Sequence, residues 1–235
     1  KKYAIPNEFC DKGIQVYGGG GGRGGEGGGR AVAFLKKPKS KIITLHLGNG
    51  CSVTAVQNGQ SIDHSMGFTP SNGLIMGTRS GDIDHGLIFY LTNTLGYNLN
   101  DVNDLLLKKS GMLGLTGYGD LRDIQNEAEK GNEECQLALQ MNAYRIKKYI
   151  GSYVAAMNGL DALVFTAGIG ENSSLLRAMV CNGMEYLGIQ MDELKNQNKT
   201  EGIREINNSD SPIKVLVIPT NEELEIAQQA YALLN

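Results

Sequence analysis

The alternation of apolar and polar positions predicts a strand meander from residue 41 onward. Lys41–Leu47 is a β-branched run, Ser52–Gln57 alternates, and Asn58-Gly59 then separates it from Ser61–Ser65. Asn-Gly between two alternating segments is a strong hairpin signal, because a type I′ turn needs positive φ at both central positions. The pattern therefore predicts three consecutive antiparallel strands.

Further along the chain the apolar period becomes that of helices. Apolar residues three or four apart line one face of Glu133–Asn158, which is the longest expected helix. Shorter helices are expected at Leu87–Leu95, Asp101–Lys109, Asp120–Glu129, Ser173–Asn182 and Glu222–Leu233. Buried strands are expected at Leu160–Ala167 and Lys214–Ile218, each followed by a turn and a helix. A strand meander followed by strand–turn–helix units predicts a mixed α/β domain.

The first forty residues differ from this pattern. All residues from 18 to 29 are glycine except Arg23 and Glu26. Glycine brings no side chain to bury and loses much backbone entropy on ordering, so such a run is typical of a flexible linker. We expect residues 1–40 to form a separate segment and residues 41–235 to form the folded domain.

Composition narrows the class of protein. The net charge is −3, which gives no electrostatic support for a nucleic-acid partner. No apolar run approaches the roughly 18 residues of a membrane span, and no basic-then-apolar leader opens the chain. The cysteines are scattered and form no metal-binding or disulfide pattern, so we expect a cytoplasmic protein with reduced thiols.

The first candidate site is the glycine-rich bend from His46 to Ser52. Gly48 and Gly50 flank Asn49 between two strands, where glycine lets backbone N–H groups approach an anion closely. Ser52 adds a hydroxyl and His46 adds a ring nitrogen. The bend lacks the GK[ST] ending of a Walker A loop and the helix of a Rossmann fingerprint. It is either an anion-binding turn or an ordinary hairpin bend.

The second candidate is Arg79, which lies among small residues and glycines that leave it exposed. A guanidinium group matches the oxygens of a transferring phosphoryl group and neutralises its charge. Asp82 and Asp84 follow closely and could hold this arginine or a metal ion. The alternative is a surface ion pair.

Two expected strands end in turns typical of nucleotide sites. Gly168-Ile169-Gly170 follows the first, with the next helix expected to begin at Asn172 or Ser173. Glu222 follows the second, as either a Mg²⁺ anchor or a helix-dipole complement. Asp120-Leu121-Arg122 opens another helix, where it either contacts a ribose or adenine or simply caps the helix.

Taken together, these segments resemble the acetate kinases of the acetokinase family. The resemblance is carried by His46–Gly50, Met76–Asp82, Phe165–Asn172 and Pro219–Leu224. It implies the superfamily of hexokinase, actin and Hsp70 ATPase domains. The fold it implies is therefore a ribonuclease-H-like (actin-like ATPase) α/β domain with a mixed sheet flanked by helices.

The resemblance also implies roles for individual residues around bound ATP/ADP and Mg²⁺. Arg79 would stabilise the transferring phosphoryl group, Pro70 would line the pocket for the acetate methyl group, and Glu222 would help position Mg²⁺. The phosphate-side residues would be His46, Leu47, Gly48, Asn49, Gly50 and Ser52. The residues that hold the adenosine would be Asp120, Leu121, Arg122, Gly168, Ile169, Gly170, Glu171 and Asn172.

The implied reaction is the reversible, in-line transfer of a phosphoryl group from ATP to acetate, which gives acetyl phosphate. The implied assembly is a homodimer. Two alternatives remain open, namely a propionate kinase and a non-catalytic nucleotide-binding module. Arg79 separates the second alternative from a kinase, because a binding module needs no arginine aimed at the transferred phosphate.

The sequence departs from the family pattern in two places. It begins where the second half of an acetate kinase begins, so a first domain that supplies further catalytic groups is not represented. Gly20 stands where the family has a catalytic histidine, and Gly19 where it has a phenylalanine. Spacing to Arg30-Ala31 is kept, so we interpret these glycines as engineered or unassigned side chains. We expect this chain alone to bind nucleotide weakly and to turn over negligibly.

Overall fold

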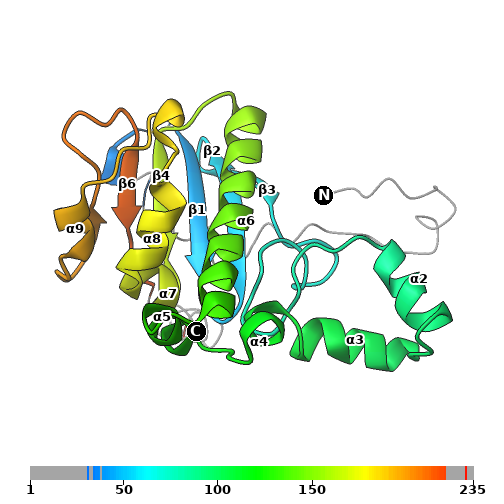
Figure 1. Ribbon diagram of the computed structural model, residues 1–235. Coiled ribbons are helices and arrows are strands. Elements are labelled where there is room, and N and C mark those ends of the chain that lie inside the picture. The colour runs from blue at the N-terminus through cyan, green and yellow to red at the C-terminus, as the bar shows by residue number, and fades with distance from the viewer. Residues whose placement is uncertain (1–30, 32–33, 38, 221–230, 232–235) are drawn as a thin grey trace, which may run out of the picture.

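The computed structural model describes residues 31, 34–37, 39–220 and 231, and its centre is one six-stranded sheet (Figure 1). The strand order is β3-β2-β1-β4-β6-β5. The strands are β1 (Lys41–Leu47), β2 (Cys51–Gln57), β3 (Gln60–His64), β4 (Ala162–Thr166), β5 (Arg204–Glu205) and β6 (Lys214–Val217). The expectations about residues 1–30, including the glycine run, lie outside the described residues.

The strand directions make the sheet mixed. Strands β1, β2 and β3 pair antiparallel in sequence order, which confirms the predicted meander. Strand β4 pairs parallel with β1, and β6 pairs parallel with β4. This arrangement confirms the predicted mixed sheet. It also brings the carboxyl ends of β1, β4 and β6 to one edge, where open α/β sheets bind ligands.

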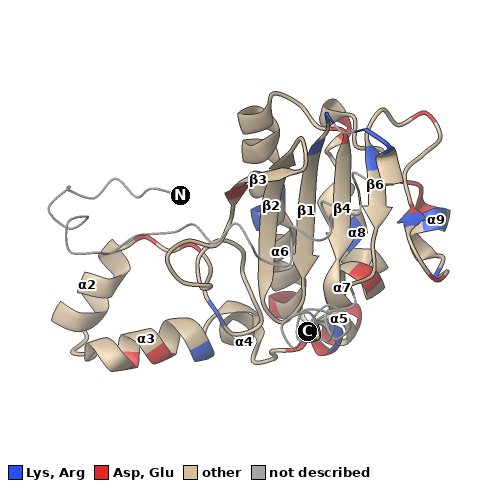
Figure 2. Ribbon diagram, turned by 180° about the vertical axis from the view of Figure 1, so that it is seen from behind, with Lys and Arg blue, Asp and Glu red and all other residues tan. Residues whose placement is uncertain are grey.

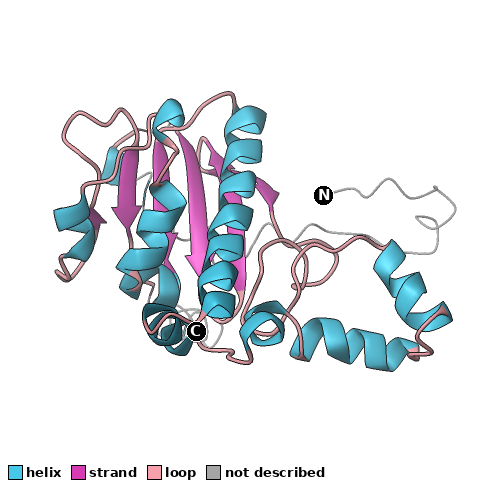
Figure 3. Ribbon diagram, viewed as in Figure 1, coloured by secondary structure: helices cyan, strands magenta, loops and turns pink. Residues whose placement is uncertain are grey.

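Helices lie against this sheet, and α6 and α8 cover the face that Figure 3 shows. Asn132 caps α6 by accepting a hydrogen bond from Cys135 N, and Ser173 caps α8 in the same way through Leu176 N. The helices are α2 (Gly86–Asn93), α3 (Leu99–Lys108), α4 (Gly111–Thr116), α5 (Leu121–Glu129), α6 (Glu133–Met157), α7 (Ala167–Asn172), α8 (Ser174–Cys181), the short 3₁₀ helix η2 (Glu185–Leu187) and α9 (Glu193–Gln197).

The five longer helices were predicted to within two residues, but the short ones were not. The predicted turn at 168–170 is wrong, because these residues belong to α7. Helices α4, η2 and α9 and strand β5 were not expected. The predicted helix Glu222–Leu233 lies outside the described residues except at Tyr231. No helix within the described ranges is both long enough and apolar enough to span a bilayer.

Hydrophobic residues fill both faces of the sheet. The larger cluster lies between the sheet and helices α6 and α8, where Phe165 and Ile146 are fully buried. The smaller cluster on the other face contains Ile42 and Val164, against which Leu35 packs. Burying one such side chain contributes about 1.5–3 kcal/mol. Strand β4 is buried along its whole length, so its end is a rigid platform for the residues that follow.

Helices α2 and α3 form an arm that projects from this core (Figure 1). Only Leu91 of α2 and Val102 of α3 are buried. Helix α2 has no Lys, Arg, Asp or Glu, and it is tan throughout in Figure 2. The arm contrasts with the sheet, which buries nearly all of its apolar residues.

Candidate functional site

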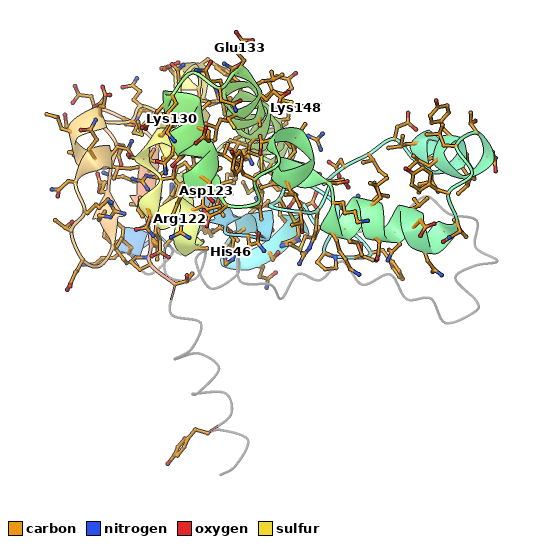
Figure 4. The ribbon with its side chains drawn as sticks, turned by 60° about the horizontal axis from the view of Figure 1, so that its bottom comes forward. His46, Arg122, Asp123, Lys130, Glu133 and Lys148 are labelled. Atoms are coloured by element: carbon orange, nitrogen blue, oxygen red, sulfur yellow. The ribbon has the colours of Figure 1, made fainter. Side chains whose placement is uncertain are left out.

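A cavity of about 590 Å³ opens at the edge where the parallel strands end. Figure 4 looks onto this side of the molecule, with His46 at the end of β1 and Arg122 on α5 both labelled. Three segments that lie far apart in the sequence form its wall. They contribute Gly48, Asn49, Gly119, Asp120, Leu121, Arg122, Gln125, Gly168, Ile169, Asn172 and Ser173. Eight of these were predicted nucleotide-binding residues, so the structure brings the three predicted segments to one cavity.

The turn at residues 48–50 joins β1 to β2 and is held by its backbone. Gly48 N donates to Gly50 O at 3.2 Å, and Cys51 Sγ donates to Gly48 O at 3.1 Å. Gly77 N donates to Asn49 O at 3.0 Å, which ties the turn to the loop that carries Arg79. A Cβ at position 77 would overlap Asn49 Oδ1 and lie 3.1 Å from Gly119 O, so a side chain there would displace Asn49. Burial raises the pKa of the Cys51 thiol to about 11, so this thiol is not a nucleophile at neutral pH.

The second wall is α7, which starts directly at the end of β4. Ala167 has a φ of +64°, a left-handed conformation that is costly for a residue with a Cβ. Strain of this kind collects at functional sites, where the surrounding structure holds it in place. The strained residue turns the chain sharply, so that Gly168 and Ile169 of α7 face the cavity.

The far end of α7 is held by two arginines. Arg177 Nη1 donates to Gly170 O at 2.8 Å and to Glu171 O at 3.0 Å, while Arg204 Nη2 donates to Glu171 O at 2.8 Å. Arg177 is 2% exposed, and its other donors reach Asn196 Oδ1 and Asn196 O, each at 2.7 Å. Burial lowers the pKa of Arg177 to about 10, so the guanidinium remains charged at neutral pH. A buried cation therefore fixes α7 through its carbonyl oxygens.

Helix α5 forms the third wall. Asp120 caps this helix by accepting from Arg122 N at 2.8 Å, and its carboxylate also pairs with the Arg122 guanidinium at 2.6 Å. This pairing lowers the pKa of Asp120 to about 2. Gln125 Nε2 donates to Ser173 Oγ at 2.5 Å, which links α5 to the start of α8. Asp120 caps the helix, as one alternative predicted, and it also lines the cavity; its contact with a ribose or adenine stays a prediction.

Arg79 lies beside this cavity in residues 73–82, which we call the arginine loop. Its Nη1 donates to Pro70 O at 2.9 Å. A Cβ built on Gly50 would lie 3.5 Å from the same nitrogen, so the guanidinium reaches the turn at 48–50. The side chain is partly buried, whereas the sequence predicted full exposure.

The interpretation that Asp82 and Asp84 hold Arg79 is wrong. Asp82 accepts from Tyr149 Oη at 2.5 Å and lies 3.6 Å from Arg145 Nη1. Asp84 Oδ1 accepts from Gly86 N at 2.8 Å near the start of α2. No carboxylate pairs with Arg79 among the residues that the structure describes, so its charge is available to a ligand.

The remaining predicted site residues that the structure describes lie in the core, next to the cavity walls or at the surface. Leu47 lies in the hydrophobic core, while His46, Ser52 and Gly170 are buried next to the walls. Glu171 Oε1 accepts from Thr220 N at 2.9 Å, which ties α7 to the chain after β6. Pro70 is exposed. Glu222 lies outside the described residues.

Three cavity residues were missed by the sequence reasoning, namely Gly119, Gln125 and Ser173. Two of them left a signal. Gly119 directly precedes the helix start at Asp120, and Ser173 was considered only as a helix cap. Gln125 lies one turn into α5 and left no signal, because its role depends on its contact with Ser173.

Comparison with known proteins identifies the family. The family model described as "Acetokinase family" matches residues 1–228. The chain belongs to the acetokinase family. It is 59% identical over 234 residues to the acetate kinase of Flavobacterium johnsoniae, a match that covers 99% of this chain and 59% of that protein.

Solved structures of the acetokinase family share the fold. The acetate kinase of Porphyromonas gingivalis is 42% identical with a TM-score of 0.90, over 100% of this chain and 60% of that one. A propionate kinase from Francisella tularensis is also 42% identical, with a TM-score of 0.87, over 97% of this chain and 58% of that one. The chain therefore spans about 59% of the length of the curated acetokinase that it matches.

Proposed function

We propose that this chain is the nucleotide-binding part of an acetate kinase, which transfers a phosphoryl group reversibly between ATP and acetate. The observation that carries the proposal is the position of Arg79. Its guanidinium reaches the Gly48–Gly50 turn at the rim of the cavity and pairs with no carboxylate of the described chain. A free guanidinium next to a turn of backbone N–H groups suits a transferring phosphoryl group.

The lining of the cavity fits a nucleotide in one orientation. Leu121 and Ile169 offer apolar surface for the adenine ring, and Asp120 and Arg122 offer polar groups for the ribose. The phosphates would then extend along Gly48 and Asn49 towards Arg79. Backbone donors and one arginine would neutralise the charge that develops in an in-line transfer, in which positioning and charge stabilisation supply most of the catalysis.

Pro70 and Arg79 would form part of the binding site for the phosphoryl acceptor, acetate. The Pro70 carbonyl binds the Arg79 guanidinium at 2.9 Å, so an acetate whose methyl group contacts the proline ring would hold its carboxylate near the arginine. The acyl pocket would need further walls from outside this chain. A propionate kinase is the second candidate, because a protein of that name is as similar to this chain as the Porphyromonas gingivalis acetate kinase.

The Mg²⁺ of the proposal needs few protein ligands, since Mg²⁺ beside phosphates keeps several waters and takes one or two carboxylates. No cluster of three metal-binding side chains occurs among the described residues. Glu171 already accepts from Thr220 N, whereas Glu222, two positions after Thr220 in the sequence, is the acidic residue that the resemblance to the acetokinase family offers for the metal. We therefore assign Glu222 to Mg²⁺. The proposal also includes a cytoplasmic homodimer, and light scattering of the purified protein tests the dimer.

The deciding experiment is Arg79→Ala in the full-length protein. We expect kcat for acetyl phosphate formation to fall by roughly 10²–10³-fold, with little change in ATP affinity. Lys130→Ala is the control, because Lys130 is an exposed cation whose partner is Glu127 and which does not line the cavity. Equal turnover by Arg79→Ala and the control would favour a non-catalytic nucleotide-binding module. The ratio of kcat/KM for acetate and propionate in the unmodified protein separates the two kinase candidates.

A further inference from the structure

The arginine loop is closed at its base by one carboxylate. Gly73 N donates to Asp82 Oδ1 at 2.8 Å, and Asp82 N donates to Gly73 O at 3.1 Å. The first and last residues of the loop are therefore joined by a side chain as well as by the backbone. Arg79 lies only three residues before Asp82, so the position of this carboxylate limits where the guanidinium can lie.

The second oxygen of Asp82 is held from α6. Tyr149 Oη donates to Asp82 Oδ2 at 2.5 Å, across 67 positions of sequence. Arg145, one helical turn earlier, donates to Gly73 O at 3.1 Å and lies 3.6 Å from Asp82 Oδ2. Because α6 is packed along the sheet and fully formed over 25 residues, it is a fixed reference for the loop.

The Tyr149 hydroxyl is well suited to holding the Asp82 carboxylate in place. Burial and the neighbouring Asp82 raise the pKa of Tyr149, so the phenol is protonated at any working pH and remains a donor. A neutral donor orients the carboxylate without adding another charge to the pair that Asp82 makes with Arg145. Hydrogen bonds to charged groups are worth about 1.5–3 kcal/mol, enough to select one loop position over others.

We propose that Tyr149 is a positioning residue for turnover, which acts through Asp82 to hold Arg79 at the phosphoryl site. The inference rests on the proposed function of Arg79. Tyr149 does not line the cavity, so its effect reaches the reaction only through the loop. Displacements of about 1 Å in a catalytic group can cost on the order of 10²-fold in rate, so a loosened loop lowers kcat without weakening ATP binding.

Helix α6 provides a matched control one turn further on. Tyr153 is 3% exposed, its ring packs edge-on against Tyr149 at 5.8 Å between centroids, and its hydroxyl has no hydrogen-bond partner in the described chain. Tyr149→Phe and Tyr153→Phe remove the same atom from neighbouring rings. Only the first removes a hydrogen bond to Asp82.

The experiment measures both variants in the full-length protein. We expect Tyr149→Phe to lower kcat about 10-fold with an unchanged KM for ATP, and to speed hydrogen exchange of the Gly73 and Asp82 amides. We expect Tyr153→Phe to change neither. Tyr149→Phe should cost no further activity in an Arg79→Ala background, because its effect passes through Arg79.

Three results would overturn the proposal. One is equal kcat in the two single variants, another is unchanged exchange in the loop, and the third is an additive loss in the double variant. Failure of the proposed function has a different signature. In that case Arg79→Ala alone would leave turnover intact, and the positioning role in turnover would fail with it.

Discussion

Two segments flank the turn at residues 48–50, and side chains of opposite charge hold them. Helix α7 is held by a buried cation, Arg177, which donates to main-chain carbonyls. The arginine loop is held by an anion, Asp82, which accepts from a main-chain amide and a phenol. Asp82 is partly exposed, whereas Arg177 is buried.

The difference in burial indicates different tasks. Removing a buried charge that satisfies several carbonyls leaves those groups without water or partner, so α7 cannot move without a large cost. A partly exposed carboxylate can exchange partners with solvent at a smaller cost. We infer that α7 is the fixed wall of the site, and that the arginine loop is the part whose position can be tuned.

Replacing Arg177 should have the largest effect on stability of the substitutions that test this difference. We expect Arg177→Leu to lower the free energy of unfolding by about 3–5 kcal/mol, because Gly170 O, Glu171 O and Asn196 all lose a buried donor and each unsatisfied acceptor costs about 1–3 kcal/mol. Urea unfolding followed by circular dichroism measures the loss. The control is Arg204→Leu, which removes a partly exposed donor to Glu171 O and should cost clearly less. Equal losses in the two variants would show that burial does not set the difference.

A methyl group placed against the main chain of the arginine loop at Met76 and Arg79 should have an intermediate effect. Gly111 has a φ of +63°, and a Cβ there would overlap Met76 O and lie 2.6 Å from Arg79 O. We expect Gly111→Ala to displace the loop, lower kcat about 10-fold and cost more than about 1 kcal/mol of stability.

Gly117, at the other end of α4, is the control for this variant. Its φ is +79°, but a Cβ there would meet nothing within 4 Å. Gly117→Ala should therefore show only the cost of the backbone conformation, with kcat unchanged. A similar kcat for both variants would contradict a tunable arginine loop. Melting temperature and steady-state kinetics supply the two measurements.

Thiol labelling gives the smallest effect and sharpens the comparison. Burial raises the pKa of Cys51 to about 11 and that of Cys181 to about 12, so at pH 8 even Cys51 holds roughly 100-fold less thiolate than an ordinary cysteine. Thiolate grows as pH rises towards these values, so labelling by iodoacetamide should increase with pH. Peptide mapping should find both residues protected in the native protein. In the Arg177→Leu variant, Cys181 on α8 should be labelled before Cys51. The reverse order would contradict the inference that Arg177 holds α7 and α8 together.

The sequence predicted the elements whose causes are local. The β2–β3 turn depends on Asn58 and Gly59, which have φ values of +54° and +80° and need no distant partner. Helix α6 has its cap and its apolar stripe within its own residues. For the same reason, the three segments of the cavity, two of which contain the predicted glycines, could be named before their arrangement was known.

The remaining features depend on contacts between distant residues. Helix α7 has only six residues, two of them glycine, and is held by Arg177, Arg204 and Thr220 from other segments. Asp82 was considered as a partner of Arg79, three positions away, or of a metal ion, but it contacts Tyr149 and Arg145 on α6. Short-range spacing cannot reveal which of several nearby cations a carboxylate will meet.

The parallel pairing of β1 with β4 also determines when the site can form. Ile42 pairs with Ala162, and Lys41 N with the Asp161 carboxylate, across 120 positions of sequence. At about 5–20 residues per second, the ribosome needs roughly 6–24 s to synthesise the chain between β1 and β4. The β1–β2 hairpin is therefore complete about that long before β4 exists. During that interval one edge of β1, which is central in the finished sheet, has no strand beside it. The turn at residues 48–50 is thus synthesised early, but the cavity forms only after an exposed strand edge has been available for pairing with other chains.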